Sequence, residues 1–359
     1  MSTLKVDTLQ NAVGENLVFT NKNLLINGGM NIWQRGTTEP GITTSAYRTA
    51  DRWLTSFTSM GTWTQSRSTD VPSAQGFGYS LKMDCTIADA SPAAGDGIII
   101  NQRIEGQNLQ HLLKGTSSAK KITLSFWVKS NKTGTYIIEL FDQDNSRNIC
   151  QSYTIDSAST WEKKTITFEG DTTGTLDNDN AASLYVQWWL GAGSNFTSGT
   201  LQTSWGTITS ANRAVGQVNL ADSTSNEWYM TGCQLEVGSV ATDFEFEPYE
   251  TVLRKCQRYF HQNDYNLSGM WIGGTAELAF VSVTYPVTMR DNPDVNYISG
   301  GVARSRQTDL NISSLYSGLP VYSNATSGAS LVYSLSSGNG VIGEGTVVRN
   351  VNMKFDAEL

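Results

Sequence analysis

The sequence is poor in charge and in the residues that most often carry enzyme chemistry. Charged residues make up 16% of the 359, and only two histidines occur. Neither histidine lies in a metal-binding or catalytic-triad motif, and the chain has no P-loop or nucleophile-elbow motif. The four cysteines, Cys85, Cys150, Cys233 and Cys256, form no C-x-x-C pair and are expected to be buried free thiols. These absences favour a binding or structural protein over an enzyme, with no metal or cofactor expected.

Long apolar runs and clusters of positive charge are also missing. Since no stretch of about 18 apolar residues occurs, we expect no membrane insertion. The N-terminal segment lacks the apolar centre of a signal peptide. A net charge of −8 without any block of Lys and Arg argues against nucleic-acid binding.

Glycine and aromatic residues are plentiful, and they point to an all-β fold. The chain has 33 Gly, 10 Trp and 14 Tyr, as expected for many tight turns and for strands rich in aromatics. Apolar and polar residues alternate most clearly in Ile122–Lys129 and in Tyr79–Cys85, whereas Ile98–Ile100 indicates a central buried strand. Strand candidates, among them 47–53 and 217–220, recur roughly every 10 to 20 residues, which is typical of a sandwich. One short helix is expected at 109–113, ended by Gly115. No repeat of fixed period indicates a β-helix or propeller.

The apolar period changes after Pro248, where we expect a short helix. Five apolar residues there recur every three or four positions and share one helical face: Val252, Leu253, Cys256, Tyr259 and Phe260. The sequence therefore predicts four segments: an N-terminal arm (1–20), a jelly-roll-like β-sandwich (21–247), a helical joint (248–262) and a smaller C-terminal β-domain (263–359). In the last of these we expect strands at 277–283, 295–298, 331–335 and 347–355, and the Gly/Ser/Asn-rich loops of 313–340 are expected to carry binding diversity.

Several motifs around this joint and upstream of it carry a family resemblance. They are LLINGGMNIWQRG (24–36), YRTADRW (47–53), ITLSFWVKSNKTGTY (122–136), QLEVGSVATDFEFEP with CQRYF (234–260), and VTYPVTMRDNPDV (283–295). In this order they resemble tail-fibre and related virion proteins of tailed bacteriophages, notably marine and cyanobacterial ones, with a jelly-roll domain like that of carbohydrate-binding modules.

The resemblance implies a non-enzymatic virion protein, made in the host cytoplasm and assembled into the particle. It implies a tail fibre or receptor-binding protein, a homotrimer, that attaches to a bacterial surface glycan or protein. A purely structural fibre that decorates the capsid or tail is the alternative, and a glycan depolymerase is a third. The N-terminal arm would anchor the protein to a phage tail or capsid protein through Leu4, Val6, Leu9 and Val13.

Aromatic residues between 185 and 205 are the candidate ligand-binding residues. They are Tyr185, Trp188, Trp189 and Trp205, whereas Trp33, Trp53 and Trp127 are expected to be core or structural residues rather than ligand contacts. Trp188 and Trp189 are adjacent, so on a strand they face opposite sides; one is expected in the core and the other could stack on a sugar ring. Packing beneath a loop or at a subunit interface is the alternative.

Acidic residues offer two candidate pairs for glycan cleavage, Asp96 with Glu105 and Asp142 with Asp144. Solvated turn residues are the simpler interpretation, because Asp is common in turns. A structural calcium would be compatible with such acidic loops, but no spacing here matches a calcium-binding loop.

Overall fold

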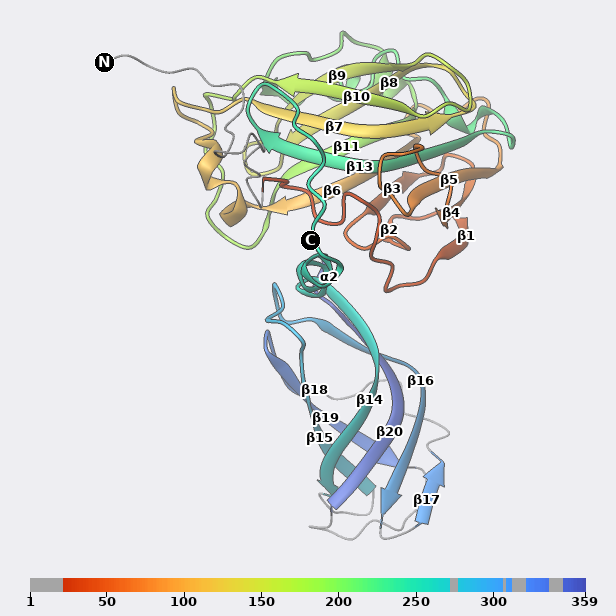
Figure 1. The fold of residues 1–359 in the computed structure, drawn as a ribbon, viewed down its shortest axis with the longest axis vertical. Helices are drawn as coiled ribbons and strands as arrows, with labels where there is room; N and C mark the ends of the chain where they lie inside the picture. Colours follow the sequence, from red (N-terminus) through yellow and green to blue (C-terminus); the bar gives the residue numbers. More distant parts are fainter. Residues whose placement is uncertain (1–21, 272–276, 306–307, 312–320, 336–344) are drawn as a thin grey trace.

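The protein folds into two β-domains joined by one short helix (Figure 1). The computed structural model describes residues 22–271, 277–305, 308–311, 321–335 and 345–359. Three antiparallel sheets contain its strands, two in the first domain and one in the second, which confirms the all-β prediction. Among the helices of these residues, none has the length and apolar character needed to cross a bilayer.

Two sheets form the sandwich of the first domain. Across the six-stranded sheet the order is β1 (Thr38–Ile42), β4 (Thr62–Ser68), β5 (Ser80–Ile87), β13 (Glu227–Val237), β7 (Ile122–Ser130) and β10 (Glu162–Phe168). Across the seven-stranded sheet it is β12 (Gly206–Thr207), β9 (Arg147–Ile155), β8 (Gly134–Asp142), β11 (Ala182–Ala192), β6 (Gly97–Glu105), β3 (Leu54–Thr58) and β2 (Ala46–Tyr47). Short helical turns connect these strands: η1 (Gly106–Asn108), η2 (Gln110–Leu112), α1 (Ser194–Thr197), η3 (Ser210–Asn212) and η4 (Leu220–Asp222).

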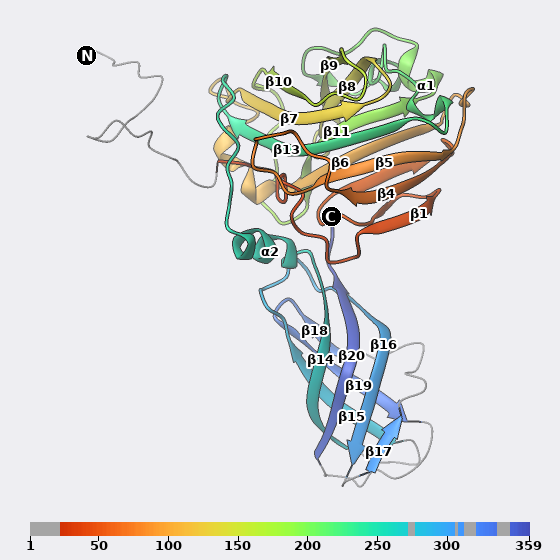
Figure 2. The ribbon, with the colours of Figure 1, turned by 45° about the vertical axis from the view of Figure 1, so that its right-hand side comes forward.

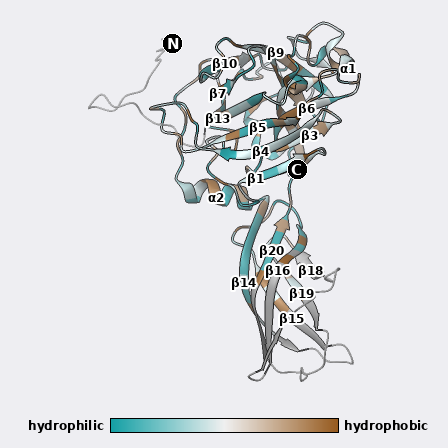
Figure 3. Cartoon of the chain, turned by 90° about the vertical axis from the view of Figure 1, so that its right-hand side faces the viewer, coloured by the Kyte–Doolittle hydropathy of each residue, from teal (hydrophilic) through white to brown (hydrophobic). Residues whose placement is uncertain are grey.

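Hydrophobic and hydrophilic residues alternate along the sandwich strands (Figure 3). In β7 the alternation places Leu124, Phe126 and Val128 in the core between the sheets, as predicted. Trp53 and Trp188 meet there edge to face, with their ring centroids 5.5 Å apart. Such pairs add to the free energy gained by burying the rings themselves.

Strand β13 contains a bulge that keeps its apolar residues in the core. Its pairing with β7 shifts register between Thr231 and Gln234. Gly232 lies inside this shift with φ +62, and a Cβ there would lie 2.5 Å from Phe77 Cζ. Glycine is therefore required by both the backbone conformation and the contact.

The second domain is a single sheet. Its order is β17 (Thr308–Asn311), β16 (Asp294–Ser305), β20 (Gly345–Asp356), β14 (Phe260–Trp271), β15 (Glu277–Thr284), β19 (Gly328–Leu335) and β18 (Val321–Ala325). Apolar side chains of β14, β15, β19 and β20 form its core, including Val281, Leu331, Val351 and Phe355. The predicted strands at 277–283, 295–298, 331–335 and 347–355 are confirmed as parts of longer strands.

Helix α2 (Tyr249–Gln257) lies between the two domains (Figure 2). Pro248 starts it, Glu250 lies in its first turn, and Arg254 and Lys255 lie in its last turn, which suits the helix dipole. Its apolar face buries Val252 and Cys256 against Ile32 of the sandwich. The predicted helix is confirmed, but the chain is already strand from Phe260, within the segment expected to be the joint.

Three expected elements differ in the structure. Residues 48–53 form no strand but a buried turn, because polar side chains there bond across the domain junction. The expected strand at 217–220 is coil that leads into η4, and within the expected helix at 109–113 only the 3₁₀ turn η2 forms.

Candidate functional site

The aromatic residues predicted to bind a ligand do not form one cluster. Trp188 is fully buried between the sheets, where it contacts Trp53 and Phe126. Trp189 lies on the opposite face of β11 and is only 1% exposed, because Phe196 of α1 packs over it and Glu139 accepts a hydrogen bond from its indole nitrogen at 3.1 Å. The expectation that one of the pair would be free to stack on a sugar is therefore wrong.

Trp205 lies apart from the other three residues and is half-buried. Its indole nitrogen donates to the Glu169 carbonyl at 2.7 Å, and the Lys114 ammonium lies 5.2 Å from its ring centroid. Both contacts fix Trp205 as packing for the end of the sandwich.

Tyr185 differs, because it lies half-buried on the outer face of the seven-stranded sheet. The register of β11 places it opposite Arg103 of β6 on one side and Phe141 of β8 on the other. The Phe141 ring meets Tyr185 edge to face at 5.5 Å, and the Arg103 guanidinium lies 4.7 Å from the Tyr185 centroid. These three side chains form a row across three strands.

Polar side chains lie beside this row on the same face. Gln187 of β11 is opposite Asn101 of β6 and Glu139 of β8. The Arg213 guanidinium donates to both carboxylate oxygens of the fully buried Glu139, at 2.8 and 2.9 Å. Asn101 donates to Ser56 Oγ at 2.9 Å, while its carbonyl oxygen has no hydrogen-bond partner among the described residues. An aromatic row flanked by amides and guanidinium groups is suited to a hydroxyl-rich ligand. We refer to Arg103, Phe141, Tyr185, Gln187 and Asn101 as the Tyr185 face.

The outer face of the six-stranded sheet carries a second row of aromatic and charged residues. Asp70 accepts a hydrogen bond from the Trp161 indole at 2.8 Å and forms an ion pair with Lys129, whose ammonium lies 4.2 Å from the Tyr229 centroid. The Tyr229 hydroxyl donates to Glu227 at 2.9 Å, and burial raises the pKa of Tyr229 to about 12. In this row each of these polar groups already has a partner within the protein.

Two tryptophans on this face were not predicted to lie there. Trp127, expected to be a core or structural residue, is half-buried and points outward, opposite Phe126. The alternation of residues in Ile122–Lys129 already indicated that Trp127 and Phe126 face opposite sides of the sheet. Trp161 lies in the turn before β10, and nothing in the local sequence pattern marked it.

The acidic residues considered for catalysis already have partners within the protein. Asp142 is fully buried and paired with Lys114, while Asp144 accepts from the Asp177 backbone at 2.9 Å. Asp96 accepts from the Ala93 backbone at 2.7 Å. Glu105 receives two hydrogen bonds from Arg258, at 3.0 and 2.8 Å. Burial acts to raise the pKa of Glu105, but hydrogen bonds, chiefly from Arg258, hold it below its usual value.

Asp142, one of these acidic residues, is among several oxygen-bearing groups that surround the Lys114 ammonium. Lys114 Nζ is paired with Asp142 and lies 3.0 Å from Asp171 Oδ2, 3.1 Å from the Thr173 carbonyl and 2.9 Å from the Gly174 carbonyl. The described residues contain no group of three or more His, Cys, Asp or Glu side chains that could hold a metal ion. The four cysteines are buried and unpaired with one another, as predicted.

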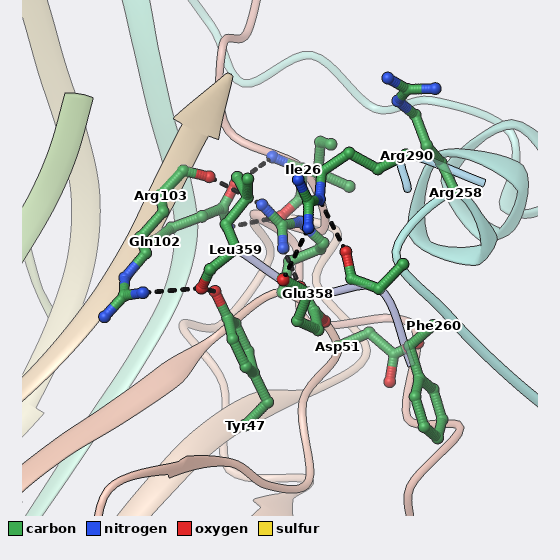
Figure 4. Close-up of polar contacts among 12 residues, drawn as sticks. Ile26, Tyr47, Asp51, Gln102, Arg103, Arg258, Phe260, Arg290, Glu358 and Leu359 are labelled. Atoms are coloured by element: carbon green, nitrogen blue, oxygen red, sulfur yellow. Dashed lines mark hydrogen bonds and ion pairs between the residues drawn. The ribbon is translucent and has the colours of Figure 1, made fainter. Parts of the chain in front are cut away.

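Four of the five motifs that carry the family resemblance, all except 122–136, contribute residues where the two domains meet (Figure 4). The chain leaves the second domain after β20 and returns to the sandwich, so that Tyr47 and Arg103 donate to the Leu359 oxygen at 3.0 and 2.7 Å. Arg290 donates to the carbonyls of Ala357 and Glu358 at 2.7 and 3.1 Å.

Two arginines of the sandwich, Arg52 and Arg35, also make contacts across this junction. Arg52 is 1% exposed, pairs with Glu358 and stacks on Tyr259 at 3.5 Å. Arg35 stacks on Phe260 at 3.5 Å and lies 3.3 Å from Glu358. Together these contacts join the two domains with buried charge.

Asp51 lies at the junction, and its burial disfavours the ionised carboxylate. Burial raises its pKa from 3.8 to about 6, although Arg35 and hydrogen bonds from Gln34 act in the opposite direction. Burial likewise raises the pKa of Tyr47 to about 12. The junction is therefore partly electrostatic and sensitive to pH.

Other predicted sites lie outside the described residues. Leu4, Val6, Leu9 and Val13, the expected virion anchor, belong to residues 1–21. Of the loop region 313–340, expected to carry binding diversity, only β18, β19 and the turn between them are described.

Comparisons with known proteins give weak structural similarities. No family model matches the sequence, and no curated protein sequence matches it. The enzymatically active domain of tailspike protein 4 from bacteriophage CBA120 is 13% identical, with a TM-score of 0.31, over 60% of this chain and 21% of the tailspike chain.

Two carbohydrate-binding modules are similar over nearly their whole length. TmCBM61, solved with β-1,4-galactotriose, is 9% identical with a TM-score of 0.32, over 61% of this chain and 100% of the module. The family 11 module from Clostridium thermocellum, solved with a mixed-linked tetrasaccharide, is 11% identical with a TM-score of 0.29, over 57% of this chain and 98% of that module.

Proposed function

We propose that the protein is a tail fibre or receptor-binding protein of a tailed bacteriophage virion, and that its sandwich binds a bacterial surface glycan through the Tyr185 face. The observation that carries the glycan-binding part is the row of Arg103, Tyr185 and Phe141 with Gln187 and Asn101 beside it. The virion assignment rests on the sequence motifs, and a homotrimer anchored by the N-terminal arm belongs to the same proposal.

The chemistry of the Tyr185 face supports a sugar over other ligands. Pyranose rings present a face of C–H groups, which packs on an aromatic ring, and an edge of hydroxyls, which pair with amides and guanidinium groups. Gln187 and Asn101 are only 5% and 2% exposed, so a ligand on this face would first meet the half-buried side chains of Tyr185, Phe141 and Arg103. The row on the six-stranded sheet is the weaker candidate, because Asp70, Lys129 and Glu227 are already paired there.

Binding without cleavage is part of the proposal. Hydrolysis needs two carboxyl groups that flank one bond and change protonation during the reaction. Glu139, the carboxylate beside Tyr185, is fully buried and receives hydrogen bonds from Arg213 on both oxygens. Both oxygens of this carboxylate are already bonded to Arg213 or Trp189 within the protein, which favours a binding role.

The test compares the variants Tyr185→Ala and Trp161→Ala, which remove one aromatic ring from each outer face. Binding of labelled protein to host bacteria, and to their purified surface polysaccharide, is measured as a function of concentration. We expect Tyr185→Ala to weaken binding about tenfold or more, since truncating an aromatic anchor costs on the order of 1–2 kcal/mol or more. Trp161→Ala should bind as the wild type does.

Three results would contradict the proposal, each a different part of it. Equal binding by the wild type and a folded Tyr185→Ala variant would exclude the Tyr185 face as the glycan-binding site. An absence of saturable binding to cells and to polysaccharide would favour the alternative, a structural fibre of the capsid or tail. Release of reducing sugar ends by the wild type would overturn the non-enzymatic part.

A further inference from the structure

An open cavity of about 420 Å³ lies beside the domain junction, and none of its described lining residues belongs to the Tyr185 face. Gln34 lines it from the sandwich, Leu253 and Gln257 line it from α2, and His261, Tyr265 and Pro286 line it from the second domain. The volume falls in the range of roughly 300–1,000 Å³ that is usual for small-molecule sites. Its walls come from all three parts of the protein.

The cavity lining is polar but uncharged. Its polar groups are carboxamides, hydroxyls and one imidazole, and none of the described lining residues is Asp, Glu, Lys or Arg. Burial lowers the pKa of His261 to about 4, so the imidazole is neutral at pH 7. A phosphate, a carboxylate or a cation would find no opposite charge here. Carboxamides and hydroxyls each donate and accept hydrogen bonds, as sugar hydroxyls do.

His261 adds an independent sign that a ligand belongs in the cavity. The residue is 2% exposed, its ring stacks on Phe355 at 4.6 Å, and its Nδ1 lies 3.0 Å from the Tyr265 hydroxyl. Nε2 is buried and has no hydrogen-bond partner among the described residues. Buried polar atoms in native proteins are nearly always paired, so an unpaired one at a cavity calls for a partner.

We propose that this cavity binds a small neutral polyhydroxylated ligand, a mono- or disaccharide, through the His261 imidazole and the Gln257 carboxamide. Leu253 and Pro286 supply the apolar surface against which the carbon face of a sugar would pack. This site is separate from the Tyr185 face and does not depend on it.

Occupation of the cavity would couple the domains. The ligand would touch Gln34 of the sandwich and His261 of the second domain at the same time. Anything that binds the native arrangement and not the separated domains stabilises that arrangement by mass action. We therefore expect a sugar that binds here to raise the temperature of the first thermal transition.

The experiment uses the full-length protein with glucose, galactose, N-acetylglucosamine and lactose as probes, each titrated into the millimolar range. Binding is followed by calorimetry, and the protein is soaked with the tightest binder for crystallography. His261→Phe keeps a flat ring for stacking on Phe355 and removes both nitrogens. Gln257→Ala changes a half-buried helix residue and serves as a second variant if His261→Phe does not fold.

We expect at least one sugar to bind the wild type, and each variant to bind it about tenfold more weakly, the equivalent of one hydrogen bond. Tyr185→Ala should leave this binding unchanged, so failure of this site and failure of the Tyr185 face are distinguishable. The inference is overturned if none of the four sugars binds, if the folded cavity variants bind as the wild type does, or if the soaked sugar lies elsewhere.

Discussion

Replacing Asp51 by Asn should change how the stability of the protein depends on pH. Asp51 lies in the turn between β2 and β3, is 1% exposed and accepts hydrogen bonds from the Gln34 backbone, at 3.0 Å, and from the Gln34 side chain. Its pKa is about 6 in the folded protein, against the ordinary value of 3.8 that an unfolded chain would show. Between these two values the folded protein binds more protons at Asp51 than the unfolded chain does.

The sign and size of the effect follow from this difference. Since the pKa is raised by folding, Asp51 contributes most to stability below pH 4, and that contribution is lost as the pH rises to about 6. A difference of about two pKa units corresponds to about 3 kcal/mol. Above pH 6 both states are ionised, and Asp51 adds no further pH dependence.

The assay is urea unfolding of the wild type and Asp51→Asn at intervals between pH 4 and pH 7. From pH 4 to pH 7 the free energy of unfolding of the variant should rise by about 3 kcal/mol relative to that of the wild type, whatever the difference between the two proteins at pH 4. Asp156→Asn serves as the control, because that side chain is 70% exposed. Parallel profiles for the wild type and Asp51→Asn would refute the reasoning and would mean that Asp51 titrates alike in both states.

Three further substitutions test other contacts. Arg258→Met leaves Glu105 buried without its cation, so the free energy of unfolding should fall by about 3 kcal/mol. Adding Glu105→Gln should recover part of this loss, and strictly additive losses in the double-mutant cycle would contradict a coupled pair. Lys114→Met removes the cation beside the fully buried Asp142 and should cost a similar amount in urea unfolding; a loss below about 1 kcal/mol would show that water replaces the ammonium. Gly232→Ala should lower the thermal midpoint while Gly78→Ala, with open space around its Cβ position, should not; equal midpoints would show that the β13 bulge adapts.

The sequence predicted most of the sandwich because its strands alternate clearly. In β7 and β5 the apolar side chains occur at every second position, and that period alone identifies an inward and an outward face. β14 was not found, because FHQNDYN is rich in residues that seldom favour strands. Its conformation comes from pairing with β20, nearly a hundred residues later, which no local pattern reveals.

The candidate site was only partly predictable for a similar reason. Tyr185 was singled out because two tryptophans follow it, yet those tryptophans are core residues. Arg103 and Phe141, which make Tyr185 a plausible binding residue, are its neighbours only because β11 lies between β6 and β8. In YRTADRW most of the expected strand is absent, because Asp51 and Arg52 bury their charges at the domain junction.

The paired ends of the second sheet have a consequence for how such proteins diversify. Phe260, where the chain enters that sheet, is the register partner of Asp356, where the chain leaves it. A different domain exchanged between these two positions would have to match the rest of the protein at these paired ends and at Arg290, which bonds Asn180 of the sandwich. Recombination at two short segments could therefore replace the second domain, provided that the incoming domain keeps the Asn180 contact and is followed by a segment that Arg52 and Arg103 can hold.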